Sequence, residues 1–260
     1  MAIERFCRAA LNDARIAFAK IDDDGAWLLL DRAPWLGGAA TGERVAPDAG
    51  RLLAPVTPSK ILCVGRNYRA HAKELGNEVP AEPMLFYKPP SSILDPGGTI
   101  ELPPPSISSR VEHEAELGVL IGKRVRNASL EEARLAVFGL TIVCDVTARD
   151  LQKKDGQWWR AKGMDTFCPV GPHVVSGVDW GSLAITCKVN EAVRQHGSTA
   201  DMIFGVSEVI RFVSEVITLE PGDLIATGTP EGVGPLVPGD RLEIEIPPLG
   251  RLHARVESRG

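Results

Sequence analysis

The sequence predicts an α+β fold that is rich in β-structure. Glycine and proline are frequent, with 26 and 20 residues, and the apolar runs between them are short. Short apolar runs bounded by turn-forming residues are typical of strands. The sequence shows no regular alternation of strand and helix segments, so a doubly wound sheet is not expected. A chain of 260 residues is long enough for one large domain and a small additional module.

The start of the chain is expected to form the small module. Residues 15–20 and 26–30 have the composition of strands, whereas residues 32–54 are rich in Gly, Ala and Pro and are expected to be a loop. We therefore place a small N-terminal β-module at residues 1–57 and the main domain at residues 58–260.

The main domain is expected to contain a few short helices among its strands. Residues 68–75 have helix-forming composition, and the prolines at positions 80 and 83 prevent a long continuation. Ser129 and Glu132 have the spacing of a capping box, which predicts a helix that begins there. Apolar residues at helical spacing predict another helix at about residues 207–219. Short apolar or alternating segments predict strands at residues 60–65, 222–227, 240–246 and 252–257.

The composition excludes several classes of function. The net charge is -5, so no basic surface is expected to attract nucleic acid or an anionic membrane. No apolar stretch approaches the roughly 20 residues that span a bilayer, and no signal peptide is evident, which favours a cytoplasmic protein. The cysteines have no C-x-x-C spacing and lie in strand-like surroundings, so reduced thiols in the core are expected. They are Cys7, Cys63, Cys144, Cys168 and Cys187.

The segment at residues 111–121 carries the strongest chemical signal. Its residues alternate with a period of two, which places Glu112, Glu114 and Glu116 on one face of a strand. Three carboxylates on a partly buried face repel one another, and a bound cation would remove that cost. The pattern alone fits equally well an edge strand whose glutamates face water.

A further carboxylate supports the first interpretation. Asp145 is the single charged residue in an apolar strand at residues 140–146, and a buried Asp is rarely unpaired. Carboxylate oxygens are hard ligands that suit Mg²⁺ or Mn²⁺, and also Ca²⁺, better than zinc. Three protein ligands leave positions open for a chelating substrate.

Other polar residues near these carboxylates are ambiguous when each is considered alone. Arg149, Gln152 and Lys162 follow Asp145 in the sequence, but such residues are usually solvated. Thr229 lies in a glycine-rich turn that fits neither G-x-G-x-x-G nor the P-loop pattern, which excludes nucleotide binding there. No G-x-S-x-G motif is present, and no His/Cys pair indicates a thiol nucleophile.

Eight segments, taken together and in order, make the chain resemble the fumarylacetoacetate hydrolase family. They cover roughly residues 58 to 257, whereas the first 57 residues match only loosely. The segments are residues 63–74, 83–89, 114–123, 144–152, 162–172, 189–191, 199–204 and 221–234.

The resemblance implies a mixed β-sheet roll that is usually a homodimer. It implies Mg²⁺ or Mn²⁺ on Glu114, Glu116 and Asp145, and it leaves Glu112 outside the ligand set. His71 and Glu74 match a His–Glu dyad of acylpyruvase-like members, on a segment that orders as a lid when ligand binds.

Physical chemistry is consistent with these roles. Residues three apart on a helix are neighbours, so Glu74 can orient His71, which would take a proton from water. An isolated pair with this spacing is more often a surface feature. Lys162 would add positive charge where an enolate forms. The remaining residues expected to hold or surround the substrate are Arg66, Tyr68, Arg149, Gln152 and Thr229.

The expected function is divalent-metal-dependent cleavage of a C–C bond in small 2-oxo acids through a metal-stabilised enolate. Acylpyruvate hydrolysis and oxaloacetate decarboxylation both fit this chemistry. One alternative is an isomerase, decarboxylase or hydratase of hydroxymuconate-type diacids. A different class is a non-catalytic, metal-stabilised dimeric binding module, although a structural ion would need neither Lys162 nor the His71–Glu74 dyad.

Overall fold

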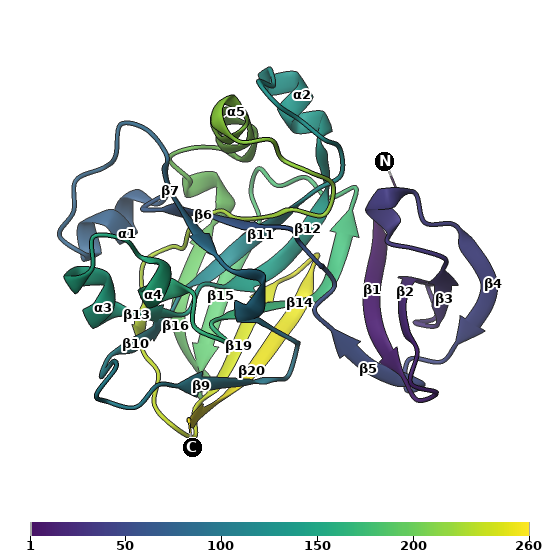
Figure 1. Cartoon of the computed structure of the whole chain (residues 1–260), viewed down its shortest axis with the longest axis horizontal. Helices are drawn as coiled ribbons and strands as arrows, with labels where there is room; N and C mark the ends of the chain where they lie inside the picture. Colours follow the sequence, from purple (N-terminus) through teal and green to yellow (C-terminus); the bar gives the residue numbers. More distant parts are fainter. Residues whose placement is uncertain (1, 260) are drawn as a thin grey trace.

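One mixed sheet of twelve strands runs from the N-terminal segment through the main body (Figure 1). The computed structural model describes residues 2–259. The order of the sheet is β4-β3-β2-β1-β14-β12-β11-β17-β6-β7, with β5 beside β1 and β8 beside β14. In the main body its strands are β6 (Ile61–Gly65), β7 (Met84–Lys88), β8 (Ile93–Leu94), β11 (Ala115–Ile121), β12 (Val137–Cys144), β14 (Cys168–Ser176) and β17 (Leu224–Ala226).

The N-terminal segment contributes five strands at one end of the molecule, drawn in purple and blue in Figure 1. They are β1 (Glu4–Leu11), β2 (Ile16–Ile21), β3 (Trp27–Leu30), β4 (Ala40–Val45) and β5 (Gly50–Leu53). The prediction of a loop at residues 32–54 is wrong, because β4 and β5 lie within it. Neither shows the alternation of apolar residues that a half-buried strand requires; β4 is almost wholly exposed and is held by backbone pairing with β3. The division at residue 57 stays a prediction.

A second sheet packs across the first and closes the hydrophobic core. Its order is β16-β15-β19-β20-β9. Strands β15, β19 and β20 pack on β11, β12 and β14, and Leu117, Ile142, Ile185 and Ile244 are among the buried residues between the two sheets. This arrangement confirms the predicted β-rich α+β fold. The strands are β9 (Thr99–Leu102), β15 (Ala184–Val189), β16 (Ala192–Ser198), β19 (Arg241–Ile246) and β20 (Gly250–Ser258).

The predicted strand at residues 111–121 is interrupted at Glu114. Its first part, β10 (Val111–His113), belongs to a small sheet with β13 (Thr147–Ala148) and β18 (Gly234–Pro235), and its second part is β11 of the large sheet. The chain changes sheets at Glu114, whose carbonyl accepts a hydrogen bond from the Asp145 N–H at 2.8 Å. Every residue of β10 and β11 is buried, so no face meets water.

Within residues 2–259, five short α-helices lie outside the sheets. The predicted capping box is confirmed, since the Glu132 N–H donates to Ser129 and the Glu132 carboxylate accepts from the Ser129 N–H. Helices α1, α3 and α4 gather on one side of the main body (Figure 1), where the candidate site lies. The helices are α1 (Arg69–Glu74), α2 (Leu130–Leu135), α3 (Arg149–Lys154), α4 (Trp159–Lys162) and α5 (Val206–Val216). The five cysteines are free and buried, as predicted.

Candidate metal centre and active site

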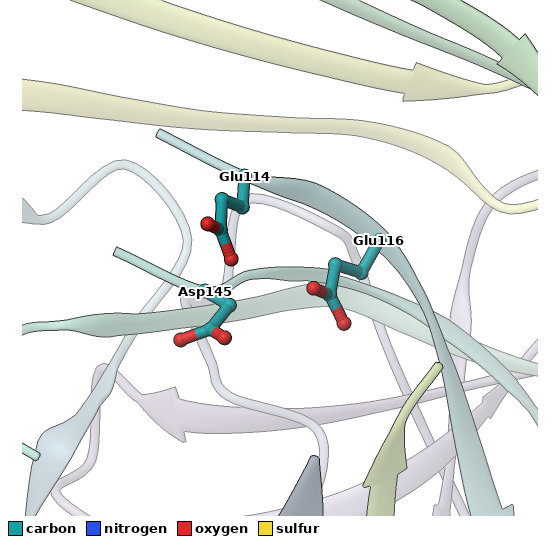
Figure 2. A group of neighbouring side chains, drawn as sticks. All are labelled: Glu114, Glu116 and Asp145. Atoms are coloured by element: carbon teal, nitrogen blue, oxygen red, sulfur yellow. The ribbon is translucent and has the colours of Figure 1, made fainter. Parts of the chain in front are cut away.

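Three carboxylates converge where two neighbouring strands change direction. Glu114 lies between β10 and β11, Glu116 lies on β11, and Asp145 directly follows β12. One oxygen of each lies within 4.8 Å of the others, and Figure 2 shows the three side chains gathered in one region. Their exposed fractions are only 4%, 2% and 0%. The alternative in which the glutamates face water on an edge strand is therefore wrong.

Two buried lysines neutralise part of this cluster. Lys162, from α4, donates to Glu114 Oε2 at 2.7 Å and to Asp145 Oδ2 at 2.6 Å. Lys88, at the end of β7, donates to Asp145 Oδ1 at 2.6 Å and to the carbonyls of Val146 and Lys162. The sequence predicted Lys162 but missed Lys88. The available signal was a lone lysine that ends an apolar strand directly before a proline.

Arg149 links the cluster to a second layer of charge. Its Nη2 donates to Glu114 Oε1 at 2.6 Å, its Nε to Glu112 Oε2 at 2.7 Å, and its Nη1 to Gln152 Oε1 at 2.5 Å. Glu112 also accepts from Arg110 Nε at 2.7 Å. Glu112 thus balances two arginines and lies outside the carboxylate cluster, in agreement with the sequence-based expectation.

The carboxylates of Glu114 and Glu116 differ in their electrostatic surroundings. Burial acts to raise the pKa of Glu114, but the adjacent Lys162 and Arg149 outweigh it and hold that pKa below its ordinary value. Burial raises the pKa of Glu116 well above its ordinary value, and the negative charges of Asp145 and Glu114 raise it further. A hydrogen bond of 2.8 Å from the Gly228 N–H only partly opposes this shift. The charged form of Glu116 is therefore less compensated than that of Glu114.

His71 and Glu74 lie together on α1, facing the same cavity. His71 Nδ1 is 3.2 Å from Glu74 Oε2, and Glu74 Oε1 accepts a hydrogen bond from the Gly232 N–H at 3.0 Å. His71 is buried. The pair is thus held between helix and loop, unlike an incidental pair on a helix surface.

A cavity of about 470 Å³ connects these groups. Phe86 and Trp158 form one wall, with ring centroids 5.4 Å apart, and Lys162 Nζ lies 4.9 Å from the Phe86 ring centroid. A cation over an aromatic face is stabilised by the ring quadrupole. The predicted residues that line the cavity are Arg66, His71, Glu74, Glu114, Glu116, Arg149, Gln152, Lys162 and Thr229.

Tyr68 was predicted to contact substrate, and this prediction is wrong for the described conformation. Its side chain is almost wholly buried and does not line the cavity. Its backbone pairs with Met202 just before α1. Its hydroxyl has no hydrogen-bond partner within residues 2–259. Burial, with a smaller contribution from Glu116, raises the pKa of Tyr68.

Thr229 lines the cavity, but its hydroxyl is already engaged. It donates to the Ala115 carbonyl at 2.8 Å and accepts from Gln195 Nε2 at 2.7 Å. The hydroxyl hydrogen therefore points back to the ligand-bearing strand and is not available to a substrate. The sequence did not indicate Gln195, because nothing in its neighbourhood distinguishes it from a solvated glutamine.

The donor set fits a hard divalent cation. Glu114, Glu116 and Asp145 offer only oxygen ligands. Lys88, Lys162 and Arg149 compensate Glu114 and Asp145, but no cationic side chain donates to Glu116 within residues 2–259, so ionising this buried carboxyl is costly without a further cation. Mg²⁺ and Mn²⁺ match such a set, and Ca²⁺ is compatible with it.

The chain matches two protein-family models and is similar to several known proteins. Residues 60–257 match the model described as fumarylacetoacetate hydrolase C-terminal, and residues 4–55 match the model described as Rv2993c-like, N-terminal. A mitochondrial oxaloacetate decarboxylase from Dictyostelium discoideum is 46% identical over 197 residues, covering 73% of this chain and 89% of the relative. A mitochondrial oxaloacetate tautomerase from Arabidopsis thaliana is 45% identical over 207 residues, covering 77% and 92%.

Solved structures agree with the sequence comparison. The crystal structure of 2-hydroxyhepta-2,4-diene-1,7-dioate isomerase from Mycobacterium marinum superposes with a TM-score of 0.90 at 41% identity, covering 99% of each chain. Within residues 2–259, no helix is long and apolar enough to cross a membrane.

Proposed function

Because the chain belongs to the fumarylacetoacetate hydrolase family, we propose that it is a divalent-metal-dependent enzyme that acts on small 2-oxo acids through an enolate. The observation that carries the proposal is the contact of Lys162 with Glu114 and Asp145 in a buried acidic cluster, at the wall of a cavity that Lys162 and Glu114 line. A structural ion would not require a buried lysine at the cavity wall, which argues against a non-catalytic binding module.

Glu114, Glu116 and Asp145 would hold Mg²⁺ or Mn²⁺. The ion, when bound, would polarise the 2-oxo group and stabilise negative charge on its oxygen. Lys162 Nζ would supply a second positive charge beside that oxygen, in a site where burial strengthens the interaction. Arg149 and Gln152 would hold the substrate carboxylate, and their mutual hydrogen bond would fix both groups before the substrate arrives.

The cations at the cavity mouth favour a substrate with a second carboxylate. Arg66 and Lys153 line the cavity and form no ion pair within residues 2–259, and Arg110 uses only its Nε to bind Glu112. A dicarboxylate would satisfy these free donors. Oxaloacetate, the acid in the names of two relatives, has this chemistry. We therefore propose decarboxylation of oxaloacetate through pyruvate enolate, or its tautomerisation through the enolate of oxaloacetate itself. Both enolates carry their negative charge on the 2-oxo oxygen.

The His71–Glu74 dyad favours a second candidate reaction, the hydrolysis of acylpyruvates. Glu74 would orient the ring of His71, and His71 would remove a proton from water that attacks the 4-oxo carbon. The C–C bond would break, pyruvate enolate would leave, and the acyl group would depart as a carboxylic acid. Decarboxylation and tautomerisation need no such attack. We further propose that the protein is a homodimer, which light scattering would test.

Turnover of oxaloacetate and of acetylpyruvate, with and without Mg²⁺ or Mn²⁺, tests the proposal. Loss of the enol absorbance should depend on the metal ion. A chain that binds the ion but turns over no oxo-acid in a panel would support the binding-module alternative. His71→Ala should abolish acylpyruvate hydrolysis and change decarboxylation differently; equal losses in both reactions would contradict water activation by His71.

A further inference from the structure

Gln195 is a buried polar residue in a strand whose neighbours face solvent. It lies on β16, where Val193, Arg194 and His196 are exposed and Gln195 has an exposed fraction of 0%. Burying an amide costs free energy unless each of its polar atoms has a partner. The hydrogen-bond partners of Gln195 therefore show which parts of the structure its buried side chain connects.

All the hydrogen-bonding positions of the Gln195 amide are used, and their direction is fixed. Oε1 lies 3.0 Å from the Ala115 N–H, which can only donate, and 3.0 Å from His113 Nδ1. Nε2 lies 2.8 Å from the Pro230 carbonyl, which can only accept, and 2.7 Å from Thr229 Oγ1. The backbone partners thus assign oxygen and nitrogen of the amide without ambiguity.

These bonds join the ligand-bearing strand to one glycine-rich loop at residues 227–234. Ala115 lies between the two glutamates of the cluster, while the loop carries Thr229 into the cavity. The same loop donates from Gly228 to Glu116 and from Gly232 to Glu74. Gly232 has a φ of 95° and abuts the carbonyl of Arg194, the residue before Gln195. One strand therefore supports a loop that touches the carboxylate cluster, the cavity wall and the dyad.

We propose that Gln195 is a positioning residue that holds Thr229 and its loop at a fixed distance from the ligand-bearing strand, so that a chelating oxo-acid fits between them. Gln195 itself does not touch the substrate. The proposal rests on the proposed function, because it assumes that the cavity binds a chelating acid. Its effect is transmitted through the Thr229 hydroxyl, which bridges Gln195 and the Ala115 carbonyl.

Oxalate, a planar chelating dianion, provides a probe that does not depend on which reaction occurs. Its affinity would be measured by calorimetry at saturating Mn²⁺ for the wild type, Gln195→Met, Thr229→Val and the double variant. Each single variant should weaken oxalate binding, by on the order of 10- to 100-fold, as for other residues that orient a metal site from outside its ligands. The double variant should be no weaker than the worse single variant, because both changes break one chain of hydrogen bonds.

Two further variants keep the test interpretable. Gln195→Glu keeps an oxygen that accepts from Ala115 and His113, but it loses both donations to the loop, so it should also weaken oxalate binding. This variant provides the test if Gln195→Met does not fold. Ser214→Ala is the matched control, since buried Ser214 accepts from the Ala128 N–H and donates to the Arg211 carbonyl away from the cavity. It should lower thermal stability and leave oxalate affinity unchanged.

The outcomes separate the two levels of inference. If wild type shows no Mn²⁺-dependent oxalate binding, the proposed function fails. If wild type binds oxalate and the Gln195 variants bind it equally well, the positioning role is overturned. It is also overturned if the fold-losses in oxalate affinity of the Gln195 and Thr229 variants multiply in the double variant.

Discussion

Replacing Lys88 with methionine should remove one of the two lysine charges that balance Asp145, while keeping most of the side-chain volume. Lys88 and Asp145 are 0% and 1% exposed and lie 2.6 Å apart. Lys88 Nζ also binds two backbone carbonyls. Methionine makes none of these bonds, so the variant would leave a buried carboxylate and two carbonyls with fewer partners.

The structure sets the size of the expected effect. Removing one member of a buried ion pair costs about 3–5 kcal/mol, because the other charge remains buried. Domains of this kind have a total stability of about 5–15 kcal/mol. Lys88→Met should therefore lower the free energy of unfolding by a large share of the total in metal-free protein. A divalent cation on the cluster should restore part of the loss, since it would take over the balance of the Asp145 charge.

Urea denaturation with EDTA and with Mn²⁺ would measure both effects. The matched control is Lys20→Met, because Lys20 and Glu4 form a contact of similar length, 2.5 Å, with exposed fractions of 39% and 41%. That exposed pair should contribute less than about 1 kcal/mol. The reasoning is refuted if Lys88→Met costs no more than Lys20→Met in metal-free protein.

Three further predictions follow from the site and the fold. Because the pKa of Glu116 is raised in the folded, metal-free protein, Glu116 keeps a proton there at pH values where the unfolded chain has released it. This difference in proton binding stabilises the folded state. The stabilisation is complete below the pKa of the unfolded chain and is lost as pH rises through the pKa of the folded protein. Mn²⁺ binding should accordingly release about one proton at pH values below the pKa of Glu116 in the folded protein. Calorimetry in two buffers would measure this release, and Glu116→Gln should abolish it. A release that persists in Glu116→Gln would show that the proton comes from another group. Lys162→Met should reduce oxaloacetate turnover by about 10²–10³-fold while Mn²⁺ still binds, and near-normal turnover would exclude a role in the reaction. Ser129→Ala should cost about 1 kcal/mol of stability through loss of the α2 cap without changing turnover, and a change in turnover would show that α2 is coupled to the site.

The sequence allowed the fold class and much of the helix pattern to be predicted, because these depend on local signals. The Ser129–Glu132 capping box and the apolar period of α5 are encoded within a few residues. Strands β4 and β5 could not be predicted in this way. Their stability comes from pairing with β3 and β1, and β4 has no apolar face to reveal it.

The same distinction between local signals and distant partners applies to the residues of the candidate site. Charged residues within unusual patterns, such as Glu114 and Asp145, could be identified from their neighbours along the chain. Lys88 and Gln195 could not, since their importance lies in partners 57 and 80 residues away. Tyr68 shows the opposite error, because its place next to α1 says nothing about the direction of its side chain.

The pairing of β1 with β14 gives the N-terminal strands a role beyond their own stability. Residues 4–6 pair with residues 174–176, and the rings of Phe6 and Trp35 lie 5.5 and 6.1 Å from that of Phe138. A chain that began at residue 58 would uncover this backbone and this ring together. An unpaired strand beside apolar surface can recruit another chain. We therefore expect the N-terminal segment to protect this edge of the sheet from self-association, and we expect its deletion to appear first as a loss of solubility.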